Sequence, residues 1–219
     1  SEHFLIVTHT HSRSFSSANA YQDAYFGSLV DDLAESGKKA VILGLPYERA
    51  FQQLERMKRL EFSIPVVPVD SCLSLKSLLI CAGEAFVAYF RPLQLKQPTV
   101  LDGLDVTFLV KQAIRETTRS GEFFVNLRLF YSTQWLAQRI KLSRCLYPYE
   151  NRAWEKRLIQ GMRSSSPKTQ MVGYQHASIT LSHTNFILAE GEGQIIPLPD
   201  TILTTGEIAT QWLEQEGNY

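Results

Sequence analysis

The chain has 219 residues, of which 44% are hydrophobic, 11% aromatic and 20% charged. This composition is that of a globular protein with a substantial core, and it excludes a mainly disordered chain. The 22 Lys and Arg residues balance the 22 Asp and Glu residues, so no overall basic charge points to nucleic acid or to an anionic membrane.

The first part of the chain alternates between strand-like and helix-like segments. Residues 3–8 (HFLIVT) are a short apolar run typical of a buried parallel strand, and a Ser-rich loop over 9–19 follows it. Apolar residues then recur at helical spacing over 21–33, which predicts a helix. Residues 38–45 (KKAVILGL) predict a second strand, which completes a β-α-β unit.

The same alternation continues with another helix and another strand. Residues 47–60 are amphipathic and rich in Glu, Gln, Lys and Arg, which predicts the helix. Residues 64–69 predict the strand, and the two prolines within it favour an edge position because proline cannot donate a ladder hydrogen bond.

A change of pattern then indicates a helical insertion, from about residue 73 to 142. Two or three long helical segments are expected there, at about 73–90, 105–119 and 122–141. Alternation resumes afterwards, with predicted strands at 143–148, 169–175 and 201–205 and predicted helices at 150–163 and 207–216. Repeated β-α units predict an α/β fold with a doubly wound, mostly parallel Rossmann-like sheet, in which ligands bind at the carboxyl ends of the strands.

Cysteine content and hydropathy bear on the compartment. The three cysteines, an odd number, cannot all pair within one chain and match no zinc framework, which indicates a reducing environment. The longest apolar stretch, residues 73–90, contains a lysine and a glutamate and is too polar for a bilayer span. A cytoplasmic protein is therefore expected.

Polar residues gather where the strand at 143–148 should end. Glu150 and Asn151 stand near the start of the next predicted helix, where exposed backbone N–H groups favour anions, so Glu150 could be only a partner of the helix dipole. Trp154 lies one helical turn further on. In a cleft, Glu150 and Trp154 could hydrogen-bond to and stack on a sugar ring; the alternative is a tryptophan packed in the core.

A histidine marks the end of the following strand. Gln175 and His176 come after the apolar residues of the strand at 169–175, and histidine can act as a base or as a hydrogen-bond donor. Because sequential strands in such sheets usually neighbour each other, we expect Glu150 and His176 to face one crevice, with His9 or His11 nearby.

Three successive blocks of the chain are YPYENRAWEKRLI from residue 147, MVGYQHASI from 171 and PLPDTILTTGEIATQWLEQEGNY from 197. Together they resemble bacterial glycosyltransferases of surface-carbohydrate biosynthesis, a family of GT-B type. In that family a Glu-Asn-x-x-Trp-Glu helix precedes a Gly-x-x-His loop and a Pro-x-Pro-Asp segment. The resemblance covers roughly residues 147–219; the earlier residues match only as Rossmann-like alternation.

The resemblance implies an enzyme of surface polysaccharide biosynthesis that transfers a sugar from an activated nucleotide donor to a hydroxyl of a glycan or lipid-linked acceptor. Residues 1–219 would be the amino-terminal, acceptor-side domain. The nucleotide sugar would be bound mainly by a second domain outside this chain, so this fragment alone would be inactive.

The resemblance places Glu150, Asn151 and His176 beside the cleft between the two domains but does not assign the catalytic base, so the candidates for single roles come from the residues themselves. The catalytic candidates are His176 and Glu150, and the substrate-binding candidates are Asn151, Arg152, Trp154, His9, His11 and Gln175. No cofactor, no required metal and no nucleic-acid partner are expected. Exposed members of an aromatic series that is otherwise expected in the core could contact a lipid-linked acceptor or the inner face of the membrane: Phe123, Phe124, Phe130, Tyr131 and Trp135.

Two other function classes remain open. His9 and His11, two positions apart after the first strand, are also how several metal-dependent hydrolases begin their site, which would need further His and Asp ligands. A non-catalytic carbohydrate-binding or interaction module is the second alternative. The motifs of dinucleotide-binding, P-loop and serine-hydrolase proteins are missing from the sequence.

Overall fold

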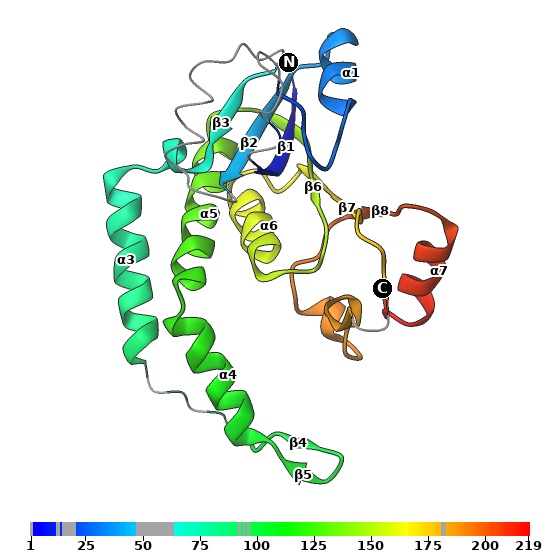
Figure 1. Cartoon of the computed structure of the whole chain (residues 1–219). Helices are drawn as coiled ribbons and strands as arrows, with labels where there is room; N and C mark the ends of the chain where they lie inside the picture. The colour runs from blue at the N-terminus through cyan, green and yellow to red at the C-terminus, as the bar shows by residue number, and fades with distance from the viewer. Residues whose placement is uncertain are drawn as a thin grey trace.

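A six-stranded parallel sheet forms the centre of the fold (Figure 1). The structure is a computed structural model that describes residues 2–11, 14, 21–46, 64–91, 93, 95, 97–180 and 183–219. Helices cover both faces of the sheet, so the predicted α/β, doubly wound Rossmann-like fold is confirmed.

The order of the strands is β3-β2-β1-β6-β7-β8, with β3 at one edge as its prolines predicted. Their bounds are β1 His3–Thr10, β2 Ala40–Pro46, β3 Val66–Pro68, β6 Leu142–Pro148, β7 Gln170–Tyr174 and β8 Thr201–Leu203. The chain winds outward from β1 in one direction and then from β6 in the other. The topological switch point, where ligands bind in folds of this kind, therefore lies between β1 and β6.

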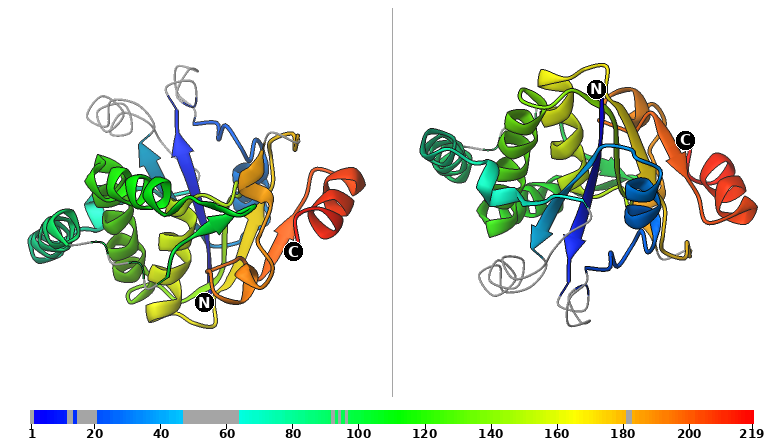
Figure 2. Two further views of the ribbon diagram at one scale, coloured as in Figure 1. Left: turned by 90° about the horizontal axis from the view of Figure 1, so that it is seen from below. Right: turned by 90° about the horizontal axis from the view of Figure 1, so that it is seen from above.

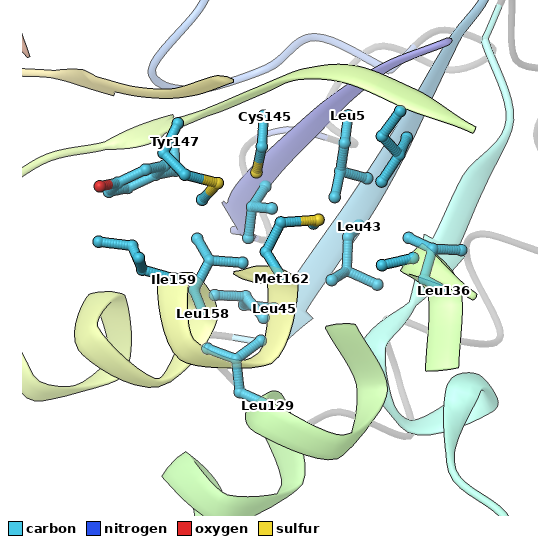
Figure 3. Close-up of a cluster of buried hydrophobic side chains, with 14 of the residues drawn as sticks. Leu5, Leu43, Leu45, Leu129, Leu136, Cys145, Tyr147, Leu158, Ile159 and Met162 are labelled. Carbon is cyan, nitrogen blue, oxygen red and sulfur yellow. The ribbon is translucent and has the colours of Figure 1, made fainter. Parts of the chain in front are cut away.

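Side chains on successive residues of β1 enter two different cores. Leu5 and Val7 belong to the larger core, which α5 (Gly121–Ala137) and α6 (Ala153–Ser165) cover. Figure 3 shows side chains from the sheet meeting side chains from these two helices. Ile6 points to the opposite face and packs with Val30 of α1 (Leu29–Glu35). Strand periodicity thus produces three layers (Figure 2).

The helical insertion between β3 and β6 is confirmed. After a short 3-10 helix, η2 (Val69–Cys72), it contains α3 (Leu75–Phe90), α4 (Thr107–Arg119) and α5. A small antiparallel hairpin that was not predicted, β4 (Val100–Leu101) and β5 (Leu104–Asp105), lies between α3 and α4. Its turn residues, Asp102 and Gly103, both have positive φ, as a tight hairpin turn requires.

The helix predicted over 21–33 is wrong in its first half, because α1 begins only at Leu29. Residues 23–27 form a turn instead, in which the carboxylate of Asp23 accepts hydrogen bonds from the backbone N–H groups of Tyr25 and Phe26. Local hydrogen bonds of this kind compete with helix formation. The helix predicted at 47–60 and most of the Ser-rich loop lie outside the described residues.

The carboxyl-terminal part follows the predicted alternation. The helix expected at 150–163 is α6, which begins three residues later, so Glu150 and Trp154 do not share a helix face as expected. The last helix is α7 (Glu207–Gln215). Two 3-10 helices, η3 (Thr184–Phe186) and η4 (Glu192–Gln194), lie between β7 and β8. Within the described residues, no helix has the length and apolar character needed to cross a membrane.

Candidate functional site

Glu150 and His176 meet at the carboxyl edge of the sheet. Glu150 lies two residues after the end of β6, and His176 lies two residues after the end of the neighbouring strand β7. The His176 Nε2 atom is 3.6 Å from the Glu150 Oε1 atom, and the two side chains are 20% and 36% exposed. The structure therefore brings together both catalytic candidates in a place that solvent reaches.

His9 joins them from the end of β1, across the switch point. Its pKa is lowered to about 4, chiefly by burial and also by the neighbouring His11 and His176, whereas Glu150 opposes the shift. The imidazole ring of His9 meets the indole ring of Trp154 edge-on, with 5.1 Å between the ring centroids. His9 is therefore neutral near pH 7.

Tyr25 is a member of the site that the sequence did not reveal. Its ring meets that of His176 edge-on, with a centroid distance of 4.6 Å, and its hydroxyl lies 3.1 Å from Nε2 of His11. Tyr25 thereby links His11 with His176. We call His9, His11, Tyr25, Glu150 and His176 the strand-end cluster.

Asp23 holds Tyr25 in place. This buried carboxylate accepts hydrogen bonds from the backbone N–H groups of Tyr25 (2.8 Å) and Phe26 (2.9 Å), and from the hydroxyls of Tyr21 (2.7 Å) and Thr8 (3.3 Å). Because Thr8 belongs to β1, the turn that carries Tyr25 is fastened to the central strand of the sheet.

A second buried carboxylate, Glu155, shapes the loop that carries Glu150. It accepts hydrogen bonds from the backbone N–H groups of Glu150 (2.9 Å), Asn151 (3.0 Å) and Arg152 (3.1 Å). Burial raises the pKa of Glu155 to about 8, and these hydrogen bonds oppose the shift. Of the two glutamates near this helix start, Glu155 is fully buried and Glu150 contacts His176 within the strand-end cluster.

Asn151 and Arg152 play different parts in this loop. Asn151 has a left-handed backbone (φ 57°), and its amide donates to the carbonyl oxygen of Asn185 (2.6 Å) and accepts from Lys156. Both ends of its side chain are thus used within the protein. Arg152 is largely exposed and lies 3.4 Å from Glu150, where its guanidinium could still contact a ligand.

Gln175 is turned away from solvent. It is fully buried, and its Oε1 atom accepts hydrogen bonds from the backbone N–H and the hydroxyl of Thr205, both at 3.1 Å. Its Nε2 atom donates to the carbonyl oxygen of Ala177. This side chain joins the loop after β7 to the loop after β8, so it supports the position of His176 and does not offer an amide to solvent.

The chemistry open to the strand-end cluster is proton transfer. Burial lowers the pKa of His176, and the nearby Glu150 carboxylate opposes this shift. A neutral imidazole can accept a proton, and an adjacent carboxylate stabilises the imidazolium that results. Among the described residues, no group of three or more His, Cys, Asp or Glu side chains could hold a metal ion, so the hydrolase alternative has no ligand set in this part of the chain.

Comparison of the chain with protein-family models, curated proteins and solved structures found no match. These comparisons therefore identify no family for the chain, and the resemblance of residues 147–219 to glycosyltransferases stays a prediction.

Proposed function

We propose that the chain is the acceptor-side domain of a glycosyltransferase that acts in surface polysaccharide biosynthesis. The observation that carries the proposal is the contact between His176 and Glu150 beside the topological switch point, the usual ligand position of a Rossmann-like sheet. A base at this position could serve an acceptor hydroxyl bound across the ends of β1, β6 and β7.

The proposed reaction uses His176 as the general base. The acceptor oxygen bonds to the anomeric carbon of the donor sugar while the bond from that carbon to the nucleotide phosphate breaks. The hydroxyl proton passes to Nε2 of His176, and the Glu150 carboxylate stabilises the imidazolium. Arg152, which lies 3.4 Å from Glu150, would contact the acceptor. Trp154 is partly buried against the core and meets the ring of His9, and it would contact the acceptor from there. The donor nucleotide would be held mainly by a second domain.

The first experiment looks for turnover. The full-length protein is titrated with a panel of nucleotide sugars and glycan acceptors, and released nucleotide is measured. We expect His176→Ala and Glu150→Gln each to lower turnover by about 10² to 10⁴, the usual contribution of a general base or of a group that assists it. His183→Ala is the matched control, since His183 bonds only locally with Thr180 among the interactions described.

The outcomes separate the function classes. Release of nucleotide that depends on acceptor and falls in both variants supports the proposal. Glycan binding without turnover for any donor would instead support a carbohydrate-binding module. Full turnover in His176→Ala would remove this histidine as the base. Melting temperatures of the variants show whether a loss of activity is merely a loss of folding.

A further inference from the structure

A cavity of about 810 Å³ is lined by residues near the carboxyl-terminal ends of α3 and α4. The two helices lie side by side in this part of the molecule (Figure 1). Half-buried side chains, among them Ile114 and Thr118, line the cavity together with three exposed arginines, Arg91, Arg115 and Arg119. Its volume is in the range of about 300 to 1,000 Å³ that small-molecule sites usually have. We call this cavity the arginine cleft.

The positive charge of the arginine cleft is not balanced by a carboxylate. None of the described residues that line it is Asp or Glu. Other arginines, such as Arg128 and Arg163, form ion pairs with carboxylates, whereas none of the three cleft arginines does so within the described part of the chain. Glu116, which follows Arg115 in the sequence, accepts a hydrogen bond from Gln112 at 2.9 Å. The cleft is therefore suited to a negatively charged ligand.

Helix geometry adds a repulsion that an anion would remove. Arg115 and Arg119 are four residues apart on α4, so they lie on the same side of the helix, and like charges at this spacing destabilise it. The partial negative charge at the carboxyl-terminal end of a helix accounts for Arg91, the C-cap of α3, and for Arg119, in the last turn of α4. It does not account for Arg115, which lies a full turn before the end of α4.

Arg119 is held in place without the loss of its hydrogen-bond donors. Its guanidinium lies over the ring of Tyr89, 5.0 Å from the ring centroid, and Tyr89 also lines the cleft. A guanidinium that stacks on a ring keeps the N–H groups at its edges available for an anion. The stack also reduces the conformational freedom that this side chain would lose when a ligand binds.

We propose that the arginine cleft binds a phosphomonoester or diphosphate group, with the phosphate oxygens between Arg91, Arg115 and Arg119. Guanidinium groups form paired hydrogen bonds with phosphate oxygens. Three of them match the roughly two negative charges of a phosphomonoester at neutral pH better than the single charge of a carboxylate. The phosphate belongs either to a soluble compound or to a lipid head group, which present the same chemistry. The cleft shares no residue with the strand-end cluster, so this proposal does not depend on the proposed function.

The test measures how the full chain binds two probes. Isothermal titration calorimetry with inorganic pyrophosphate represents a soluble ligand. Sedimentation with phosphatidylcholine vesicles that contain phosphatidic acid, a lipid phosphomonoester, represents a head group. Vesicles that contain phosphatidylserine in its place are also negatively charged but lack a terminal phosphate. We expect binding of pyrophosphate, of phosphatidic acid vesicles or of both, and much weaker binding of phosphatidylserine vesicles.

Variants show whether this binding takes place in the arginine cleft. Arg115→Gln should weaken it at least about tenfold, because hydrogen bonds between a guanidinium and a charged group are lost. Arg115→Lys retains the charge but not the planar fork, and it should lose most of the affinity as well. Arg144→Gln, an exposed change on β6 outside the cleft, is the matched control and should bind like the wild type. Circular dichroism verifies that each variant is folded.

The outcomes identify the ligand or overturn the proposal. Binding of pyrophosphate alone assigns the cleft to a soluble phosphate compound, and vesicle binding for which pyrophosphate competes assigns it to a lipid. No binding of either probe, or equal binding by Arg115→Gln and the wild type, would overturn the proposal. So would full binding by Arg115→Lys, equal losses in Arg115→Gln and Arg144→Gln, or equal binding of phosphatidylserine vesicles, since each of these results would show only a general attraction between charges.

Discussion

The Nε2 atom of His176 lies 3.6 Å from Oε1 of Glu150, although the two residues belong to different β-α units. The contact arises because β6 and β7 are neighbours in the parallel sheet and both strands end at the same edge. Burial lowers the pKa of His176 and Glu150 opposes this shift. The pKa of His176, and with it the ability of this histidine to accept a proton, therefore depends on the balance between burial and the charge of Glu150.

Replacing Glu150 by Gln should lower the pKa of His176 further. The carboxylate favours the protonated imidazole, so its loss removes the larger of the two effects that oppose burial; the hydrogen bond with the backbone of Tyr174 is the other. The measurement is an NMR titration of the His176 ring protons against pH. Glu122→Gln, an exposed change at the start of α5, should have no effect. An unchanged His176 titration in Glu150→Gln would show that the two groups do not interact in solution.

The parts of the fold that the sequence predicted well are those with strong, simple periodicity. The apolar runs of β1, β2 and β6 and the long helices of the insertion appear close to their expected bounds. The meeting of Glu150 and His176 was also expected, because neighbouring parallel strands place their ends together. Their catalytic roles stay predictions.

Other features depend on contacts that a periodic pattern does not encode. Apolar residues recur at helical spacing from Tyr21 to Leu33. The hydrogen bonds of Asp23 nevertheless fold the first half of this segment into a turn, and this turn places the Tyr25 ring against His176. The choice between Glu150 and Glu155 as the buried glutamate is made by tertiary packing. The β4–β5 hairpin did have a signal, the Asp102-Gly103 pair, but each of its strands has only two residues.

Asp23 should be important for the position of His176, because it holds the turn that carries Tyr25 against the His176 ring. Asp23→Ala removes the acceptor of four hydrogen bonds and should lower the free energy of unfolding by about 2 to 4 kcal/mol. Asp23→Asn retains an oxygen for the N–H groups of Tyr25 and Phe26 and should cost only about 1 kcal/mol. Urea unfolding measures both. The ring protons of His176 should shift in Asp23→Ala as Tyr25 moves; equal losses in the two variants would contradict this account.

Gly161 permits the close approach of α6 to α5. A Cβ atom there would overlap the Thr133 hydroxyl and the carbonyl oxygen of Phe130. Gly161→Ala should therefore lower the free energy of unfolding by about 1 to 3 kcal/mol, as overpacking of a core does. Gly121→Ala, where no atom lies within 4 Å of the added carbon, is the control and should change stability by less than about 1 kcal/mol. If the two variants are equally stable in thermal unfolding, α5 and α6 move apart enough to accommodate the added methyl group without a loss of stability.

Glu155 should make the stability of the protein depend on pH. Its folded pKa, about 8, lies above the ordinary value of 4.5, so the folded state holds this proton more tightly than the unfolded state does. The contribution of Glu155 to the free energy of unfolding is therefore fully present below about pH 4.5 and is lost as the pH rises toward 8. Glu155→Gln has no proton to lose, and its unfolding free energy should fall less over this range. Urea unfolding of both proteins at pH 5, 6.5 and 8 measures the difference. If wild-type stability instead rises relative to Glu155→Gln, the three backbone N–H groups outweigh burial and hold this carboxylate ionised.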